Sequence, residues 1–347
     1  MSPYQIRLPD LLSVLPQGRR LKDRPTNPNF AQLDANFSSW VTNSAPLPPK
    51  QKKTILQAQM PYLVALVYPD ASLSQLTVCL RYMLLSLVLE NLTDNASTDQ
   101  CRAWTDMFVG LLKGEKLDEK SSQAKHPMYQ FMAGLSAHVM KEISDTHRHA
   151  FISENEAAAE SIVKEALDRE ISSSDNGCTT SLAEYMDHRQ ATIGLRPFLV
   201  LERWVRGIDL PDTIFHHPVV KAMVDAAVEM VFIANDIYSY KKECIAGEAS
   251  HNIITVIMHD NCAGVSKGDI QGAFDVAFSM FRGAWAQFVQ AKEYLDEDEN
   301  YGALTEAYSA ALLDCVAGNI HWSLICDRYS VFEDEKSRVC RLISIQV

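Results

Sequence analysis

From Ser72 onward the apolar residues recur at the three- and four-residue spacing of an α-helix, and this periodicity constrains the fold more than any other feature. The first such stretch has apolar side chains at Leu76, Leu80, Met83, Leu84, Leu87 and Val88. Further helices are predicted near residues 100–113, 127–148, 152–170, 180–193, 196–206, 218–244, 268–296 and 301–329. Alternating β-branched runs are almost absent, and only residues 252–260 are ambiguous. We therefore predict an all-α fold of about ten helices, several of them apolar all round and buried.

The first 50 residues differ from the rest of the chain, because eight of the 14 prolines lie there. Proline interrupts helices and favours turns, so this part is predicted to contain turns and short helices. We expect residues 1–347 to form a single domain. In it, residues 1–50 would be an irregular segment packed on a helical bundle.

The sequence shows no sign of export or of a membrane span. Charges and prolines interrupt the N-terminal stretch where a signal peptide needs an unbroken apolar core. The apolar stretch 82–89 is too short to cross a bilayer, and the stretch 219–237 contains four charged residues. Eight cysteines are present without a C-x-x-C pair, which favours reduced thiols in a protein core. We expect a cytoplasmic protein without a transmembrane segment.

The formal net charge is −12. Because the phosphate backbone of nucleic acid would repel such a protein, non-specific nucleic-acid binding is not expected. An acidic protein can nevertheless bind an anionic substrate if metal ions reverse the local sign of the charge.

The segment "NDIYSYKKE" (235–243) follows a long apolar helical run and contains three oxygen donors one turn apart. Asn235, Ser239 and Glu243 stand at i, i+4 and i+8 and therefore share one face of a helix. An amide oxygen, a hydroxyl and a carboxylate are ligands that Mg²⁺ prefers. The alternative is a solvated polar end of an amphipathic helix, and these three residues alone do not decide between the two.

A second acidic pair ends the helix of "LLSLVLENLTDN". Glu90 and Asp94 stand at i and i+4 on one helix face, together with Leu87 three residues earlier. The pair could be the exposed end of a core helix. Carboxylates at a helix C-terminus are, however, unfavourable for the helix dipole, which favours a compensating cation there.

A site with several Mg²⁺ ions usually binds phosphate between them, and phosphate needs basic donors. Lys242 adjoins Glu243, Arg189 lies before a helix break at Gly194, and Arg328 precedes Tyr329 in "WSLICDRYS". Taken singly, each of these cations is more often a surface or snorkelling residue than a ligand.

Taken together, these motifs resemble those of class I terpene synthases. "NDIYSYKKE" matches the family's N-D-x-x-S-x-x-x-E metal motif, and Arg189 lies 46 residues before Asn235, where the family has a diphosphate-sensing arginine. "GNIHWSLICDRYS", "LPDLLS" and "NPNF…W" resemble segments of fungal, basidiomycete-type sesquiterpene synthases. The resemblance covers nearly the whole chain in the right order.

The chain departs from the family pattern at the first metal motif. Where the family has D-D/E-x-x-D, this sequence reads Glu90-Asn91-Leu92-Thr93-Asp94, so the leading aspartate is a glutamate and the second acid an asparagine. Leu87 stands where relatives often have an aromatic residue. The carbonyl expected at the helix break after Arg189 could belong to Thr192, Ile193 or Gly194.

The resemblance implies a helical bundle around a central apolar cavity and a lyase of isoprenoid biosynthesis. Three Mg²⁺ ions, for which Mn²⁺ may substitute, would be held by Glu90, Asp94, Asn235, Ser239 and Glu243. Arg189, Lys242, Arg328 and Tyr329 would bind the diphosphate of a prenyl diphosphate. Trp322 would face the carbocation, and Met83, Leu87 and Trp322 would line the substrate pocket. The segment "CIAGEASHN" (244–252) would be a mobile lid.

Farnesyl diphosphate is the expected substrate, and a sesquiterpene hydrocarbon or alcohol the expected product. A monoterpene synthase using geranyl diphosphate remains an alternative, as does a degenerate, non-catalytic protein that binds prenyl diphosphates. A chain-elongating prenyltransferase would need a second aspartate-rich motif, which the sequence lacks. A helical scaffold without a small-molecule site is a further possibility. The protein is expected to be a monomer or a homodimer.

Overall fold

The computed structural model describes residues 4–19, 26–117, 124–174, 181–260, 264–266, 268–298 and 302–345. Its helices are α1 (Phe30–Asn43), α2 (Pro49–Gln57), α3 (Met60–Val67), α4 (Leu73–Thr93), α5 (Thr98–Leu112), α6 (Pro127–Glu142), α7 (Asp145–Ser174), α8 (Leu182–Thr192), α9 (Arg196–Arg206), α10 (Asp212–Phe215), α11 (Pro218–Ala246), α12 (Ile253–His259), α13 (Ile270–Glu297), α14 (Gly302–Ile325) and α15 (Glu335–Cys340). Two short strands, β1 (Tyr4–Arg7) and β2 (Leu342–Ile345), accompany them. The all-α prediction is confirmed.

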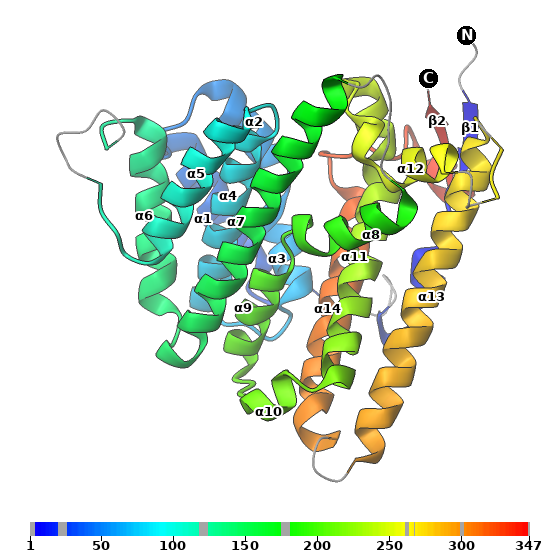
Figure 1. Ribbon diagram of the computed structural model, residues 1–347. Helices are drawn as coiled ribbons and strands as arrows, with labels where there is room; N and C mark the ends of the chain where they lie inside the picture. Colours follow the sequence, from blue (N-terminus) through cyan, green and yellow to red (C-terminus); the bar gives the residue numbers. More distant parts are fainter. Residues whose placement is uncertain are drawn as a thin grey trace.

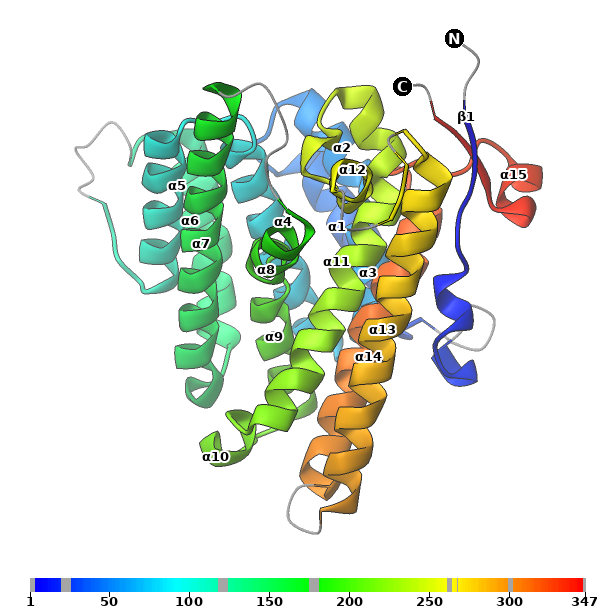
Figure 2. The same cartoon turned by 45° about the vertical axis from the view of Figure 1, so that its right-hand side comes forward.

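The long helices form a bundle with α11 at its centre (Figure 1). α11 packs against α13 and α14, and α14 also packs on α3. On the other side of the bundle α7 packs against α5 and α9, and α4 packs against α6 (Figure 2). The short helices α8 and α9 are consecutive in the chain and lie between these two groups of helices. The chain therefore changes direction at the α8–α9 junction, in the middle of the bundle.

Local sequence explains where the main helices begin and end. Ser72 and Gln75 form a capping box at the start of α4, since each side chain bonds the other residue's backbone N–H. α11 starts with Pro218 after the N-cap His217, whose ring accepts a hydrogen bond from the backbone of Val219. It ends at Gly247, whose φ of 76° lies in the left-handed region that favours glycine.

The helices of the core carry few polar residues, as the periodicity predicts. In α11 the residues from Met230 to Tyr240 are buried except Asn235, which is partly exposed. Glu229, just before this stretch, is also partly exposed. α4 is long and apolar enough to cross a bilayer by length and composition, but most of that stretch is buried inside the protein. Burial of this kind is typical of a helix in the core of a globular protein.

Four boundaries differ from the sequence prediction. The N-terminal 50 residues are not wholly irregular, because α1 is a regular helix of 14 residues. The stretch 127–148 is two helices, separated at Ile143 and Ser144. The ambiguous segment 252–260 forms α12, capped by Asn252. The helix predicted over 301–329 ends at Ile325, so Arg328 and Tyr329 lie in the turn after it.

The strands were not predicted, and they join the two ends of the described chain. β1 pairs antiparallel with β2, and Tyr4 lies opposite Ile345. Four-residue strands with mixed burial carry little periodic signal, so only their pairing reveals them.

Six of the eight cysteines belong to the described residues, and four of these six, Cys79, Cys101, Cys315 and Cys326, are buried free thiols. Cys178 and Cys262 lie outside the described residues.

Candidate active site

A cavity of about 420 Å³ lies between α3, α4, α7, α11 and α14 and the α8–α9 junction. Its apolar lining comes from earlier turns of the helices, for example Met83 and Leu87 of α4, Val231 of α11 and Phe198 of α9. Its charged lining comes from the C-terminal parts of α4 and α11, from α7 and α8, and from the turn after α14. One end of the cavity is therefore charged, and the rest is apolar.

The structure brings all of the predicted site residues to this one cavity. The lining includes Glu90, Asp94, Asn235, Ser239 and Glu243, the predicted metal ligands. It also includes Arg189, Lys242, Arg328 and Tyr329, the predicted diphosphate donors, and Met83, Leu87 and Trp322, the predicted pocket residues. These residues come from separate parts of the chain, so their convergence is a property of the fold.

The three oxygen donors of α11 are held in place by neighbouring side chains. Asn235 donates through Nδ2 to the hydroxyl of Tyr329 at 2.7 Å, and its Oδ1 accepts from Arg189 at 3.2 Å. Glu243 accepts a hydrogen bond from Asn252 Nδ2 at 2.9 Å. Burial raises the pKa of Glu243, while a hydrogen bond from Ser239 opposes that shift.

Two buried residues that the sequence analysis missed organise this side of the cavity. Asp236 is 1% exposed and accepts hydrogen bonds from Arg189 at 2.7 Å, from the Tyr185 hydroxyl and from the backbone N–H of Ile253 at 3.0 Å. Asn252 is fully buried and also donates to the carbonyl of Asp236. Asp236 stands next to Asn235 in the motif, but only the fold shows that it binds Arg189.

The acidic end of α4 is more exposed. The Glu90 side chain is 51% exposed and forms an ion pair with Arg328 at 2.9 Å. Asp94 is the residue that caps the end of α4. Partial burial, followed by the nearby charge of Glu90, raises the pKa of Asp94 to about 6. Asn91 is exposed and is not part of the cavity lining.

Trp322 closes the cavity on the side of α14. Its indole nitrogen donates to the carbonyl of Ala58 at 2.8 Å, and its ring packs edge to face on Tyr329 at 5.2 Å between centroids. The indole orientation is therefore fixed by a hydrogen bond, and the residue lines the cavity.

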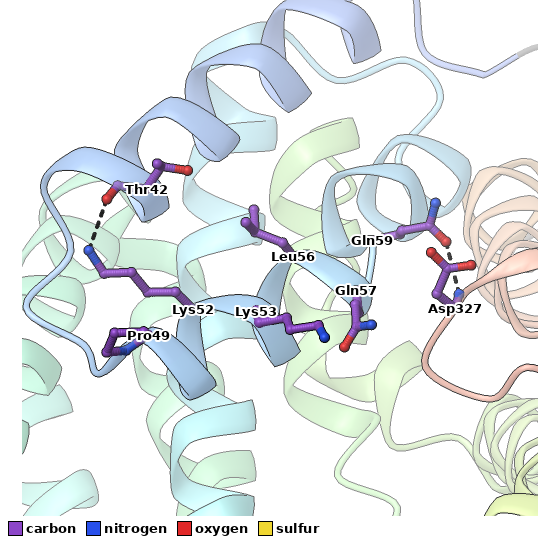
Figure 3. A pocket seen from close by; sticks show the side chains of 8 residues that line it. All are labelled: Thr42, Pro49, Lys52, Lys53, Leu56, Gln57, Gln59 and Asp327. Carbon is purple, nitrogen blue, oxygen red and sulfur yellow. Dashed lines mark hydrogen bonds between the residues drawn. The ribbon is translucent and has the colours of Figure 1, made fainter.

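A hydrogen bond to Gln59, which lies between α2 and α3, holds the turn after α14 in place. The backbone N–H of Asp327 donates to the side-chain oxygen of Gln59 at 3.1 Å (Figure 3). A hollow beside this contact is lined by Thr42, Pro49, Lys52, Lys53, Leu56, Gln57, Gln59 and Asp327 (Figure 3). It shares no lining residue with the cavity. Because Asp327 precedes Arg328, the contact helps to hold the Arg328–Tyr329 pair at the cavity.

α7 contributes charges that the sequence analysis did not select. Glu165 and Arg169 line the cavity, and Arg169 donates to the carbonyl of Thr93 at 3.1 Å. Both lie one turn apart on a long polar helix, a pattern that is indistinguishable from a solvated surface in the sequence.

At the other side of the cavity, α8 ends at Thr192 and Gly194 has a φ of 65°. Thr192, Ile193 and Gly194 all line the cavity, so the choice of carbonyl stays open.

The donor set fits a hard divalent cation. Within the part of the chain that the structure describes, no three His, Cys, Asp or Glu side chains come together as a metal cluster. Asn235 and Ser239 place an amide and a hydroxyl oxygen beside the Glu243 carboxylate at the cavity. Oxygen donors of this kind suit Mg²⁺ better than zinc or copper.

Comparisons with known proteins agree with this geometry. A family model described as "Terpene synthase family 2, C-terminal metal binding" matches residues 81–287, more than half of the chain. A Delta(6)-protoilludene synthase of Stereum hirsutum is 27% identical, with 94% of this chain and 84% of the relative covered. The sesquiterpene synthase Agr1 of Cyclocybe aegerita is 24% identical, with 98% and 93% covered.

Solved structures share the fold at low sequence identity. An α-eudesmol synthase is 20% identical and superposes with a TM-score of 0.71 over 87% of this chain and 96% of its own. A hedycaryol synthase in complex with HEPES is 21% identical, with a TM-score of 0.69 over 92% and 97% of the two chains.

Proposed function

The chain belongs to the terpene synthases of family 2, and we propose that it converts farnesyl diphosphate to a sesquiterpene in a Mg²⁺-dependent reaction that releases diphosphate. The observation that carries this proposal is the single cavity whose charged end holds Asn235, Ser239 and Glu243 together with Arg189 and Arg328. The names of the fungal relatives support a C₁₅ substrate.

The roles follow from the position of each group. Asn235, Ser239 and Glu243 on α11, and Asp94 with Glu90 on α4, would hold the metal ions. Mg²⁺ bound there would supply the positive charge that neutralises the diphosphate and assists the cleavage of the C–O bond. We expect three ions, for which Mn²⁺ can substitute.

The basic residues bind and orient the leaving diphosphate. Arg189, Lys242 and Arg328 contribute cationic donors, and Tyr329 contributes a hydroxyl. Arg189 presents a planar guanidinium that can donate two hydrogen bonds to one phosphate. Arg189 Nη2 also donates to Asn235 Oδ1 at 3.2 Å, so this diphosphate donor lies directly beside a proposed metal ligand.

The apolar part of the cavity protects the carbocation that remains after ionisation. Met83, Leu87 and Phe198 exclude water, which would otherwise quench the cation. Trp322 offers an aromatic face for cation–π stabilisation. The segment 244–252 is proposed to move over the diphosphate, with Asn252 as its buried anchor.

The decisive experiment is incubation of the purified protein with geranyl, farnesyl or geranylgeranyl diphosphate and Mg²⁺. Volatile products are identified by mass spectrometry, and diphosphate release is measured in parallel. We expect C₁₅ products from farnesyl diphosphate, and none with EDTA or with the Glu243→Gln variant. Products from geranyl diphosphate alone would support a monoterpene synthase. Mg²⁺-dependent thermal stabilisation by diphosphate without any product would indicate a non-catalytic binding protein.

A further inference from the structure

The buried carboxylate of Asp236 joins three parts of the charged end of the cavity. Its Oδ1 accepts a hydrogen bond from Arg189 Nη2 at 2.7 Å. Its Oδ2 accepts hydrogen bonds from the Tyr185 hydroxyl and from the backbone N–H of Ile253 at 3.0 Å. Because Asp236 is only 1% exposed, its charge depends on these donors. One oxygen therefore holds the proposed diphosphate-binding arginine, and the other fixes the carboxylate to the protein.

Tyr185 belongs to this network without lining the cavity. It stands four residues before Arg189 on α8, so the two side chains share one face of a helix that packs against α11 and α12. Tyr185 is buried and is not among the residues that line the cavity. Its hydroxyl carries a single proton, and it also lies 3.2 Å from the carbonyl of His251. Tyr185 can therefore influence a bound substrate only through a neighbouring residue.

Arg189 is the neighbour through which such an influence would pass. Its side chain is 20% exposed and lines the cavity, and its Nη2 bonds both Asp236 and Asn235. An arginine side chain has many rotamers, so fixing its guanidinium in advance lowers the entropic cost of binding a phosphate. Asp236 supplies that constraint as long as its own carboxylate is fixed. Without the Tyr185 hydroxyl, Oδ2 would keep only the backbone N–H of Ile253, and the carboxylate could turn away from Arg189.

We infer that Tyr185 is a positioning residue for diphosphate binding: its hydroxyl fixes Asp236, and Asp236 holds the guanidinium of Arg189 at the cavity. The inference rests on the proposed function and extends it to a residue outside the cavity lining. The alternative is a core tyrosine whose hydroxyl only satisfies its own hydrogen bond. A purely structural role changes stability, whereas a positioning role changes the affinity for diphosphate and does so through Arg189.

The test is a double-mutant cycle that measures the affinity for inorganic diphosphate. Tyr185→Phe removes the hydroxyl and keeps the ring, and Arg189→Gln removes the cation but keeps an amide that can donate to Asp236. Wild type, both single variants and the double variant are titrated with diphosphate at saturating Mg²⁺, and the thermal shift gives each apparent dissociation constant. Tyr129→Phe is the matched control, because its hydroxyl accepts a hydrogen bond from the backbone of Leu117 at 3.1 Å and neither residue lines the cavity.

We expect Tyr185→Phe to raise the apparent dissociation constant about tenfold, in line with the loss of one hydrogen bond to a charged group. In the Arg189→Gln background the same change should alter the constant by less than about twofold, because no guanidinium is left to position. Tyr129→Phe should leave the constant unchanged. Circular dichroism and thermal unfolding without ligand check that each variant is folded, and product formation from farnesyl diphosphate by the wild-type protein is measured in parallel.

An unchanged dissociation constant in Tyr185→Phe would overturn the inference and leave the proposed function intact. An equal effect of Tyr185→Phe in both backgrounds would also overturn it, since the hydroxyl would then not act through Arg189. A Tyr185→Phe protein that does not fold would do the same, because the hydroxyl would then serve folding. A wild-type protein that forms no product and shows no Mg²⁺-dependent stabilisation by diphosphate would instead overturn the proposed function, and this inference with it.

Discussion

The two sides of the charged end differ in how firmly their oxygen donors are held. On α11, Ser239 is 3% exposed, Asn235 is bonded by Arg189 and Tyr329, and Glu243 is bonded by Asn252. On α4, the Glu90 side chain is half exposed and forms an ion pair with Arg328 of the turn after α14, and Asp94 lies at the very end of its helix. The α11 side is preorganised, whereas the α4 side can adjust. A chain with an altered first motif can thus keep one rigid set of ligands and adapt the other.

The largest effect is expected on the rigid side. Glu243→Gln keeps the size of the side chain but removes the charge proposed to bind the metal ion. Product formation should fall by more than about 100-fold, beyond the loss typical of residues outside the ligand set. The measurement is product yield from farnesyl diphosphate, with circular dichroism to show an intact fold. Turnover within a few-fold of wild type would contradict the assignment of α11 as a metal-binding helix.

On the adjustable side the two carboxylates should respond unequally. Asp94→Asn should nearly abolish turnover, because its shorter side chain makes it the stricter ligand of an ion that demands octahedral geometry. Glu90→Asp should be tolerated, and Glu90→Gln should cost roughly tenfold, in line with a ligand that also pairs with Arg328. The measurement is diphosphate release across a Mg²⁺ titration.

Asn91→Ala serves as the control for these variants, since Asn91 is exposed and outside the lining. Equal loss in Glu90→Gln and Asp94→Asn would show that Glu90 is a full ligand and that the α4 side is as strict as α11. No effect in either variant would place the metal ions elsewhere.

Arg189→Lys tests the link that holds the rigid side together. Arg189 contacts Asn235 and the buried Asp236 at once, and a lysine ammonium cannot reproduce this fork. We expect diphosphate release to fall by about 100-fold, comparable to the loss of one transition-state donor. An unchanged rate of diphosphate release would show that Arg189 has a structural role and does not bind the diphosphate.

The pH dependence of metal binding should reveal the raised pKa values. A carboxyl whose pKa is raised on folding binds its proton more tightly in the folded protein than in the unfolded one. Asp94, with a pKa of about 6, is therefore charged at pH 8 and becomes protonated as the pH falls through 6. The half-saturating Mg²⁺ concentration for thermal stabilisation by inorganic diphosphate should rise about fivefold between pH 6 and pH 5.

Glu90→Gln provides the control for this experiment. It removes the like charge that contributes to the raised pKa of Asp94, so the rise in half-saturating Mg²⁺ should begin at lower pH. A Mg²⁺ requirement that does not change from pH 8 to pH 5 would show that Asp94 is not a ligand.

The smallest effect on rate, and a clear one on products, is expected at Leu87. This residue lines the cavity one turn below Glu90, where a phenylalanine would add an aromatic face beside the cation. Leu87→Phe should shift the product ratios by a few-fold while diphosphate release changes little. The measurement is the product mixture from farnesyl diphosphate by mass spectrometry. An identical mixture in the variant would show that Leu87 packs into the core and does not meet the substrate.

The helical class and the oxygen-donor triad were readable from the sequence, because both are periodic. The three-and-four spacing of leucines defines α4 locally, and the four-residue spacing of Asn235, Ser239 and Glu243 places them on one face of α11 whatever surrounds the helix. The family resemblance then connected Arg189 and Arg328 to that triad, and the structure brings these residues to the same cavity.

Tertiary structure alone decided which side chains hold the ligands. Asp236, Asn252 and Arg169 have no periodic signature, and their roles arise from contacts between elements that are distant in the chain. The β1–β2 pair and the end of α14 at Ile325 were likewise hidden, because short strands and helix ends depend on a partner surface.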